Sequence, residues 1–231
     1  MISWPPVYQI KRHARAKHVR LRPISRGELL ITVPNRFKLA EIPGILDDNR
    51  AWITKQLLSL PAESVETLPN MIPLRAMGKE WKVVYVASDN KLTLMERPHG
   101  ELVLVGNTQD MALCKTKLVS WLRNIATHFL SDQLHSLSAD ISLPFESVCV
   151  RDQKTLWGSC TSAKDINLNY KLIFLPARLA RHVMVHELCH TRHLNHSVKF
   201  WDLVTKFDID WEQHRRELRK ANQYMPAWLS G

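Results

Sequence analysis

Two histidines four positions apart, His186 and His190, impose the strictest structural requirement in this sequence. They belong to the segment His186-Glu187-Leu188-Cys189-His190, inside a stretch that predicts a helix over 178–192, after Pro176. Residues four apart project from one face of a helix, so both imidazoles can reach a single ion while Glu187 points beside it. This geometry suits a catalytic zinc site in which Glu187 is the general base.

The third ligand is a choice among His182, His193 and His196, because a catalytic zinc site has three protein ligands and an open position. Three ligands along one straight helix would span about 10 Å at 1.5 Å per residue, too far for one tetrahedral ion. That distance disfavours His182 and His193. Asn195 and Ser197 are turn and cap residues, so the chain can reverse there and aim His196 at the ion. We expect His182 to be a surface histidine or to lie behind the ligands. The predicted ligands of one Zn²⁺ are His186, His190 and His196.

Other residues near this motif have two interpretations each. Trp157–Thr161 and Ile166–Asn169 predict a hairpin, which is either an edge where an extended peptide pairs or a core hairpin with a buried Trp157. Cys160 and Cys189 are either extra metal ligands or small buried hydrophobic residues, and the second role is commoner.

The aromatic residues after the motif predict a packed C-terminal segment. Asp202 either orients a ligand histidine or is a solvated carboxylate. The aromatic residues expected in the core are Phe200, Trp201, Trp211 and Trp228.

Periodicity predicts an α+β fold with a mainly β unit over 1–105 and a helical unit over 106–231. In the first unit we expect a hairpin within 7–34, a helix over 39–60 broken near Pro43-Gly44, a connector from Pro61 to Pro73, and strands at 82–86, 91–95 and 101–105. In the second we expect helices over 110–137, 178–192 and 210–224, with strands at 147–151 and 166–170.

Charge and composition narrow the class of protein. No apolar stretch approaches the roughly 18 residues of a membrane span and the N-terminus lacks a secretory signal, so we expect a cytoplasmic protein with no membrane partner. The formal net charge is +10, and seven basic residues precede the first acidic one, Glu28. Such an arm favours contact with nucleic acid or another polyanion, although basic arms are also common solvated surfaces. The seven residues are Lys11, Arg12, Arg15, Lys17, Arg20, Arg22 and Arg26.

Several segments together resemble the YgjP-like metallopeptidase domain, a group of zincins related to SprT-type proteases. They are Trp157–Cys160, Ile166–Asn169, His186–His190, Asn195–Ser197 and Phe200-Trp201, and the basic strand pair, Val33-Pro34 and Trp52-Ile53 are similar too. The resemblance implies a mainly β N-terminal unit packed on a zincin-like helical core, which holds a small sheet and the H-E-x-x-H helix. It also implies one zinc ion on His186, His190 and His196, with Glu187 catalytic.

The resulting hypothesis is a soluble zinc metallopeptidase that hydrolyses peptides or proteins with a zinc-bound water activated by Glu187. Two alternatives stay open because of the positive charge. One is a metal-dependent phosphohydrolase acting on nucleotides or nucleic acid, and the other is a nucleic-acid-associated protein whose metal is structural. Neither alternative explains a glutamate directly after the first ligand as well as peptide hydrolysis does.

Overall fold

The computed structural model describes residues 4–25, 27–59 and 67–229, and the chain divides into two compact units, Met1–Glu66 and Thr67–Gly231. Sequence periodicity placed this boundary between residues 105 and 106 instead. The difference arises because strands after residue 70 bury Ile72, Leu74 and Leu102 in the same core as the long helix that follows them. The β strands up to residue 106 therefore belong to two different cores.

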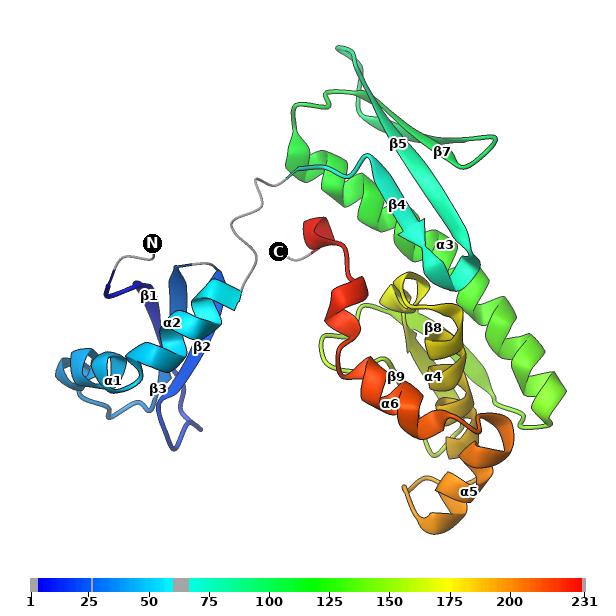
Figure 1. Cartoon of the computed structure of the whole chain (residues 1–231). Helices are drawn as coiled ribbons and strands as arrows, with labels where there is room; N and C mark the ends of the chain where they lie inside the picture. Colours follow the sequence, from blue (N-terminus) through cyan, green and yellow to red (C-terminus); the bar gives the residue numbers. More distant parts are fainter. Residues whose placement is uncertain (1–3, 26, 60–66, 230–231) are drawn as a thin grey trace. The chain divides into compact units, whose positions relative to one another are not determined.

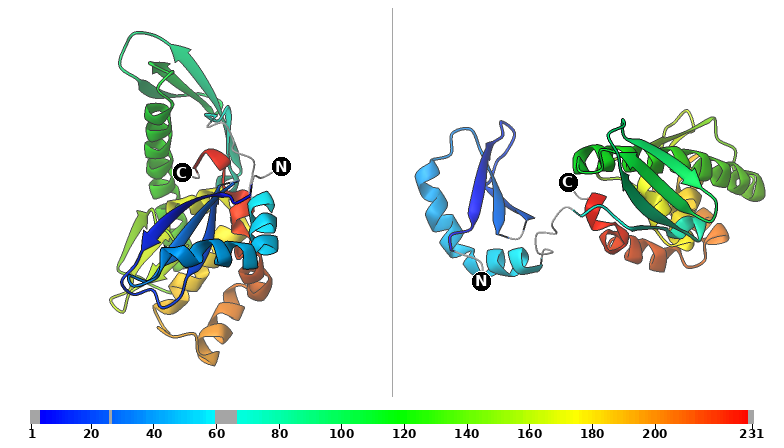
Figure 2. Two further views of the ribbon diagram at one scale, coloured as in Figure 1. Left: turned by 90° about the vertical axis from the view of Figure 1, so that its left-hand side faces the viewer. Right: turned by 90° about the horizontal axis from the view of Figure 1, so that it is seen from above.

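Unit 1 (Met1–Glu66) is a three-stranded sheet backed by two helices (Figure 2). β2 (Arg20–Ser25) and β3 (Glu28–Val33) pair antiparallel, which confirms the predicted hairpin, and β1 (Val7–Arg12) adds a parallel strand on the other side of β3. Alternate residues of β3 are buried against α1 (Ile42–Asp48) and α2 (Arg50–Ser59). This alternation is the mark of a sheet with one covered face.

The helical run of unit 1 is divided, as the sequence predicts, but at a different residue. Pro43 lies in the first turn of α1, where a missing N–H breaks no hydrogen bond. The division falls at Asn49, whose side-chain amide donates to the carbonyl of Ile45 at 2.8 Å and competes with the regular helix pattern. The sequence predicts a connector from Pro61 to Pro73. Its part up to residue 66 lies outside the described residues, and its last residues, from Met71 on, belong to a strand.

Unit 2 (Thr67–Gly231) begins with a four-stranded sheet of order β4-β5-β7-β6. The three predicted strands are β5 (Lys79–Ala87), β6 (Thr93–Arg97) and β7 (Glu101–Gly106), and the sequence did not predict β4 (Met71–Leu74). The predicted long helix is α3 (Met111–Ile141), whose apolar stripe, including Leu118, Leu122 and Leu130, is fully buried. Asp110 begins it by accepting a hydrogen bond from the backbone N–H of Leu113 at 2.9 Å.

A second small sheet of unit 2 has the order β8-β10-β9, so that β9 (Gly158–Cys160) is an edge strand. β10 (Asp165–Asn169) pairs parallel with β8 (Ser147–Arg151) and antiparallel with β9. Three helices follow, α4 (Ala177–His190), α5 (Val198–Phe207) and α6 (Trp211–Leu218). α5 was not predicted, and the predicted last helix is α6 followed by a 3₁₀ turn at Ala221–Tyr224.

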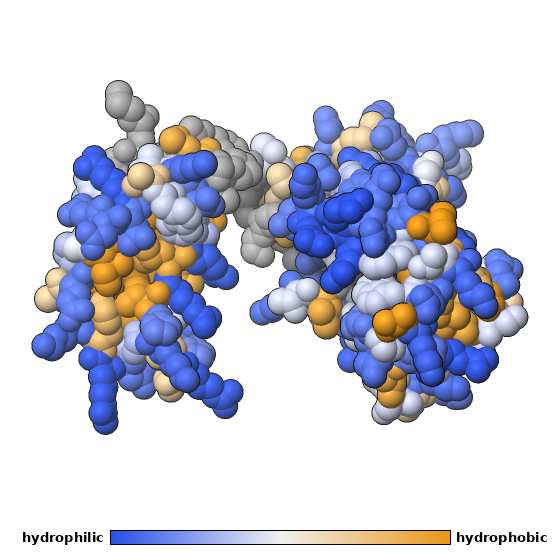
Figure 3. Space-filling model, turned by 60° about the horizontal axis from the view of Figure 1, so that its bottom comes forward, coloured by the Kyte–Doolittle hydropathy of each residue, from blue (hydrophilic) through white to orange (hydrophobic). Residues whose placement is uncertain are grey.

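Over the described residues the fold is α+β, with six α-helices and three small sheets. None of the described helices is long and apolar enough to cross a membrane. Hydrophilic residues cover most of the face of unit 2 that Figure 3 shows, whereas hydrophobic residues gather in the middle of that face of unit 1.

Candidate metal centre

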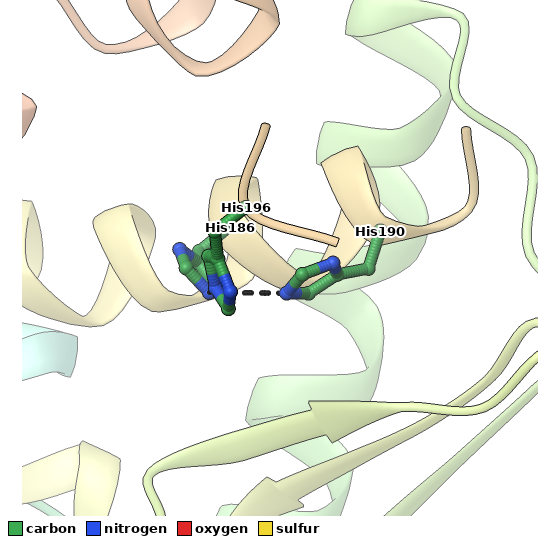
Figure 4. Close-up of side chains that lie close together, drawn as sticks. All are labelled: His186, His190 and His196. Carbon is green, nitrogen blue, oxygen red and sulfur yellow. Dashed lines mark hydrogen bonds between the residues drawn. The ribbon is translucent and has the colours of Figure 1, made fainter. Parts of the chain in front are cut away.

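Helix α4 positions the first two histidines of the motif. It begins after Pro176, and Leu179, Val185 and Leu188 on its inner side are fully buried. His186 and His190 lie near its end, one turn apart, and both project to the same side (Figure 4). The predicted helix and the predicted shared face are thus present.

The chain reverses directly after α4 and returns the third histidine. The Thr191 hydroxyl donates to the carbonyl of Leu188 at 2.8 Å where the helix ends, and α5 begins after Ser197. The Nε2 atom of His186 lies 3.2 Å from Nε2 of His190 and 3.1 Å from Nε2 of His196 (Figure 4). His196 is therefore the histidine that the reversal brings to the pair.

The arrangement of the three converging ring nitrogens is better explained by a shared cation than by hydrogen bonds among them. Nδ1 of His190 lies 2.9 Å from the carbonyl oxygen of His193, which can only accept, so Nδ1 carries the proton and Nε2 keeps a lone pair. A proton on Nε2 of His186 could reach only one of its two neighbours. Ligand nitrogens about 2.0–2.1 Å from a tetrahedral ion lie about 3.3 Å apart, close to the distances found. The three residues fit one ion of the type that imidazoles prefer, such as Zn²⁺.

Burial favours the uncharged form of two of these ligands, His186 and His190. Desolvation, and then the neighbouring His190 and His196, lower the pKa of His186 to about 3. Desolvation also lowers the pKa of His190. Neutral imidazoles present the lone pairs that a metal ligand needs. His196 is exposed, so the cluster opens to solvent on its side.

Glu187 occupies a dry environment beside β9. It is 5% exposed, and desolvation raises its pKa to about 8. None of the described residues donates a hydrogen bond to its carboxylate, and a nearby divalent cation would favour the ionised form. A carboxylate without a partner is free to take a proton from water.

Gly158 explains how β9 can approach Glu187 so closely. A Cβ atom built on Gly158 would lie 2.7 Å from both Cγ and Oε1 of Glu187, closer than real Cβ contacts. Any other residue at position 158 would therefore push the Glu187 side chain away or move β9. The sequence marked the segment 157–161, but it gave no reason to single out this glycine.

A second histidine cluster lies one helical turn earlier. Nδ1 of His182 lies 2.5 Å from Oδ2 of Asp208, and Nδ1 of His214 lies 3.0 Å from Oδ1 of the same carboxylate. All three residues are buried. A separation of 2.5 Å is much too short for two ligands of one ion, and it identifies a short charge-assisted hydrogen bond instead. Asp208, the residue that follows α5, thus accepts hydrogen bonds from two imidazoles and links His182 of α4 to His214 of α6.

Aromatic side chains form a wall beside the metal ligands. Trp201 stacks on His196 with ring centroids 5.5 Å apart, and Trp211 stacks on Trp201 at 4.1 Å. The guanidinium of Arg215 lies 5.2 Å from the centre of the Trp201 ring. Phe200 is fully buried against His190, as a core residue should be, whereas Trp201 is only half-buried and belongs to the site.

The geometry agrees with a comparison of the sequence with known families. The YgjP-like metallopeptidase domain matches residues 17–221. The chain belongs to the YgjP-like metallopeptidase domain family. The predicted resemblance is thereby confirmed, and the family name identifies a metal-dependent peptidase in general terms.

Two further comparisons add little to the YgjP-like assignment. The crystal structure of the metallopeptidase zymogen of Pyrococcus abyssi abylysin is similar with 20% sequence identity and a TM-score of 0.37. The match covers 41% of this chain and 95% of the abylysin zymogen chain. A comparison with curated proteins gives no match.

The structure also separates the alternatives that the sequence left open. His193 offers its backbone carbonyl to His190 rather than its imidazole to the ion, and His182 is buried rather than at the surface. Neither Cys160 nor Cys189 belongs to the described cluster of possible metal ligands. Asp202 is exposed, so the group that orients His190 is the His193 carbonyl.

Proposed function

We propose that this chain is a zinc peptidase in which His186, His190 and His196 hold the ion and Glu187 is the general base. The observation that carries the proposal is the convergence of the Nε2 atoms of His190 and His196 on that of His186, at 3.2 and 3.1 Å, next to a buried carboxylate for which the described residues offer no hydrogen-bond donor. A zincin-like core, built around α4 and the β8-β10-β9 sheet, is part of the same proposal.

A bound zinc ion would act as a Lewis acid that lowers the pKa of water and polarises a carbonyl group. Glu187 takes the proton of the attacking water and later delivers it to the leaving amine. The dry environment favours this second step, because a carboxyl with a raised pKa holds its proton until the amine requires it. His193 keeps the ring of His190 in one orientation through its carbonyl.

The edge strand β9 offers a place for the substrate. Among the described strands β9 pairs only with β10, so it offers the backbone groups on its outer side to an extended peptide. Gly158 of this strand lies against Glu187, because a Cβ atom at Gly158 would meet the Glu187 side chain at 2.7 Å. A peptide paired with β9 would thus lie beside the proposed base. The half-buried Trp157, just before β9, packs on the core, which suggests that both interpretations of this hairpin contribute.

The test is a pair of variants that should fail differently. Glu187→Gln keeps the size of the side chain but cannot accept the proton, so hydrolysis should fall by about 10²-fold or more while zinc stays bound. His186→Ala should lose zinc, together with the stability that the ion adds to the folded state. Peptide hydrolysis and metal content are measured on the same preparations.

Normal peptide hydrolysis by Glu187→Gln would remove Glu187 from the mechanism. A zinc-loaded wild type that cleaves no peptide but hydrolyses phosphate anhydrides would replace the proposal with a phosphohydrolase. If the zinc-loaded wild type has neither activity, the metal is structural.

A further inference from the structure

The basic residues near the N-terminus are part of a folded sheet, and the strand register assigns each to a face. Lys11 of β1 and Arg20 of β2 both pair with Thr32 of β3, and Arg22 pairs with Leu30. Residues that pair across neighbouring strands share a face of the sheet. In β3 the buried residues, such as Ile31, alternate with Leu30 and Thr32, which therefore point to the opposite, outer face. Lys11, Arg20 and Arg22 therefore lie together on the outer face, where all three are exposed.

Arg12, the neighbour of Lys11, has a different role. It pairs with the buried Val33 and so lies on the covered face of the sheet. Its guanidinium donates to the backbone carbonyls of Pro34, Asn35 and Phe37. Arg12 thus holds the loop after β3, and the outer face depends on the three other cations.

Most of the charge of unit 1 is segregated between the two sides of its sheet. Among the described residues, no acidic group forms an ion pair with Lys11, Arg20 or Arg22. Three of the described acidic residues of unit 1, Glu41, Asp47 and Asp48, belong to the helical segment that backs the sheet. The fourth, Glu28, lies on the outer face but at the other end of β3 from Thr32, the partner of Lys11, and it accepts a hydrogen bond from Gln9 at 2.7 Å. None of the described elements of unit 1 covers the outer face, so these cations are free to meet a polyanion.

The spacing and chemistry of the face favour phosphates rather than bases. Lys11 and Arg20 are separated by the width of two strand spacings, about 10 Å, and Arg20 and Arg22 by about 7 Å along β2. None of the described side chains on this face is aromatic, and single strands are normally bound by stacking bases on aromatic rings. The remaining positions are aliphatic or polar, Val7, Gln9, Leu30 and Thr32, apart from one acidic residue, Glu28, at the far end of β3 from Thr32.

We propose that the outer face of the β1-β3-β2 sheet binds duplex nucleic acid through its phosphates, with Lys11, Arg20 and Arg22 as the contacts. Such binding is insensitive to base sequence and is dominated by release of counterions. It is independent of the metal centre, because none of these residues belongs to unit 2.

Fluorescence anisotropy of the full zinc-loaded chain with a labelled DNA duplex of about 20 base pairs tests the proposal. Three phosphate contacts, at about −0.9 each in the slope of log affinity against log salt, predict roughly 40-fold weaker binding at about 200 mM than at about 50 mM salt. The triple variant Lys11→Gln, Arg20→Gln, Arg22→Gln should bind about 10-fold or more weakly at the lower salt and lose most of that slope.

Two matched variants separate this face from net charge. Lys91→Gln, Lys154→Gln, Lys220→Gln removes the same charge from exposed lysines of unit 2 and should change the affinity less than about twofold. Lys11→Arg, Arg20→Lys, Arg22→Lys keeps the charges of the face and should bind like the wild type. The thermal unfolding temperature of each variant shows that it is folded.

Three results would overturn the proposal. The first is a wild type that does not bind the duplex or binds it without salt dependence. The second is an equal loss of affinity in the unit 1 and unit 2 triple variants. The third is a preference for a single strand of the same length, or for vesicles of anionic lipid, over the duplex.

Discussion

Two clusters, each with at least two histidines, share helix α4 but differ in what surrounds their nitrogens. In the first, His186, His190 and His196 direct Nε2 atoms at one another, and no anion lies between them. In the second, the carboxylate of Asp208 stands between His182 and His214 and accepts from both. The converging nitrogens of the first cluster need a cation as their common partner, whereas the residues of the second cluster satisfy one another by hydrogen bonds. Histidines that lie close together are therefore a weak sign of a metal site. A stronger sign is that no nearby group accepts a hydrogen bond from their converging nitrogens.

The largest expected effect on stability is that of removing the Asp208 carboxylate. Asp208→Ala leaves two buried imidazole N–H groups without an acceptor, and we expect a loss of about 3–5 kcal/mol in the free energy of unfolding. Zinc content should stay near one ion per chain, because none of the proposed ligands changes. Urea unfolding and metal analysis of the same protein provide the two measurements.

Asp202→Ala is the matched control for this variant, since Asp202 is exposed on the neighbouring α5. Its free energy of unfolding should change by less than about 0.5 kcal/mol. A variant at Asp208 that loses its zinc while remaining folded would show that the second cluster, and not the first, holds the ion.

A smaller effect is expected where β9 touches the proposed base. In Gly158→Ala, the new methyl group displaces Glu187, so kcat for peptide hydrolysis should fall by about 10- to 100-fold with zinc still bound. Gly44→Ala is the control, because a Cβ atom at Gly44 of α1 meets nothing within 4 Å. Full activity of Gly158→Ala would mean that the position of Glu187 does not limit catalysis.

The smallest effect concerns pH in the metal-free protein. Burial raises the pKa of Glu187 from 4.5 to about 8, so the folded state holds this proton more tightly than the unfolded state does. Its contribution to stability is present below about pH 4.5 and is lost as the pH rises to about 8. The lowered pKa of His186 acts in the opposite sense, because the unfolded state takes up a proton below about pH 6.5 that the folded state refuses.

Comparison of Glu187→Gln with the wild type isolates the first of these two contributions. The unfolding temperature of the metal-free variant should gain a few °C on that of the wild type between about pH 5 and pH 8. Parallel curves for the two proteins over this range would show that the Glu187 carboxyl titrates normally.

The sequence predicted those parts of the site that depend on local spacing. His186 and His190 share a helical turn, and Asn195 and Ser197 signal the reversal that returns His196, so a segment of eleven residues, 186–196, carries the whole ligand set. Periodicity likewise predicted the long helix α3 and the strands β5, β6, β7, β8 and β10, within a few residues at their ends.

Features that depend on distant residues were not predictable in the same way. His182 and Asp208 are 26 positions apart, and nothing near either residue indicates the hydrogen bond between them. The contact of Gly158 with Glu187 also needs the three-dimensional position of β9. β4 was missed because the sequence pattern placed its residues up to Pro73 in a connector, although Pro73 lies on an edge strand, where a missing N–H is tolerated.

Metal analysis of three histidine variants tests the assignment of the ligands most directly. The wild type should bind about one zinc ion per chain. His196→Ala should lose it, whereas His214→Ala should keep it because His214 belongs to the self-satisfied cluster. His193→Ala should keep it too, because His193 contributes only a backbone carbonyl. Zinc retained by His196→Ala but lost from His214→Ala or His193→Ala would contradict the account.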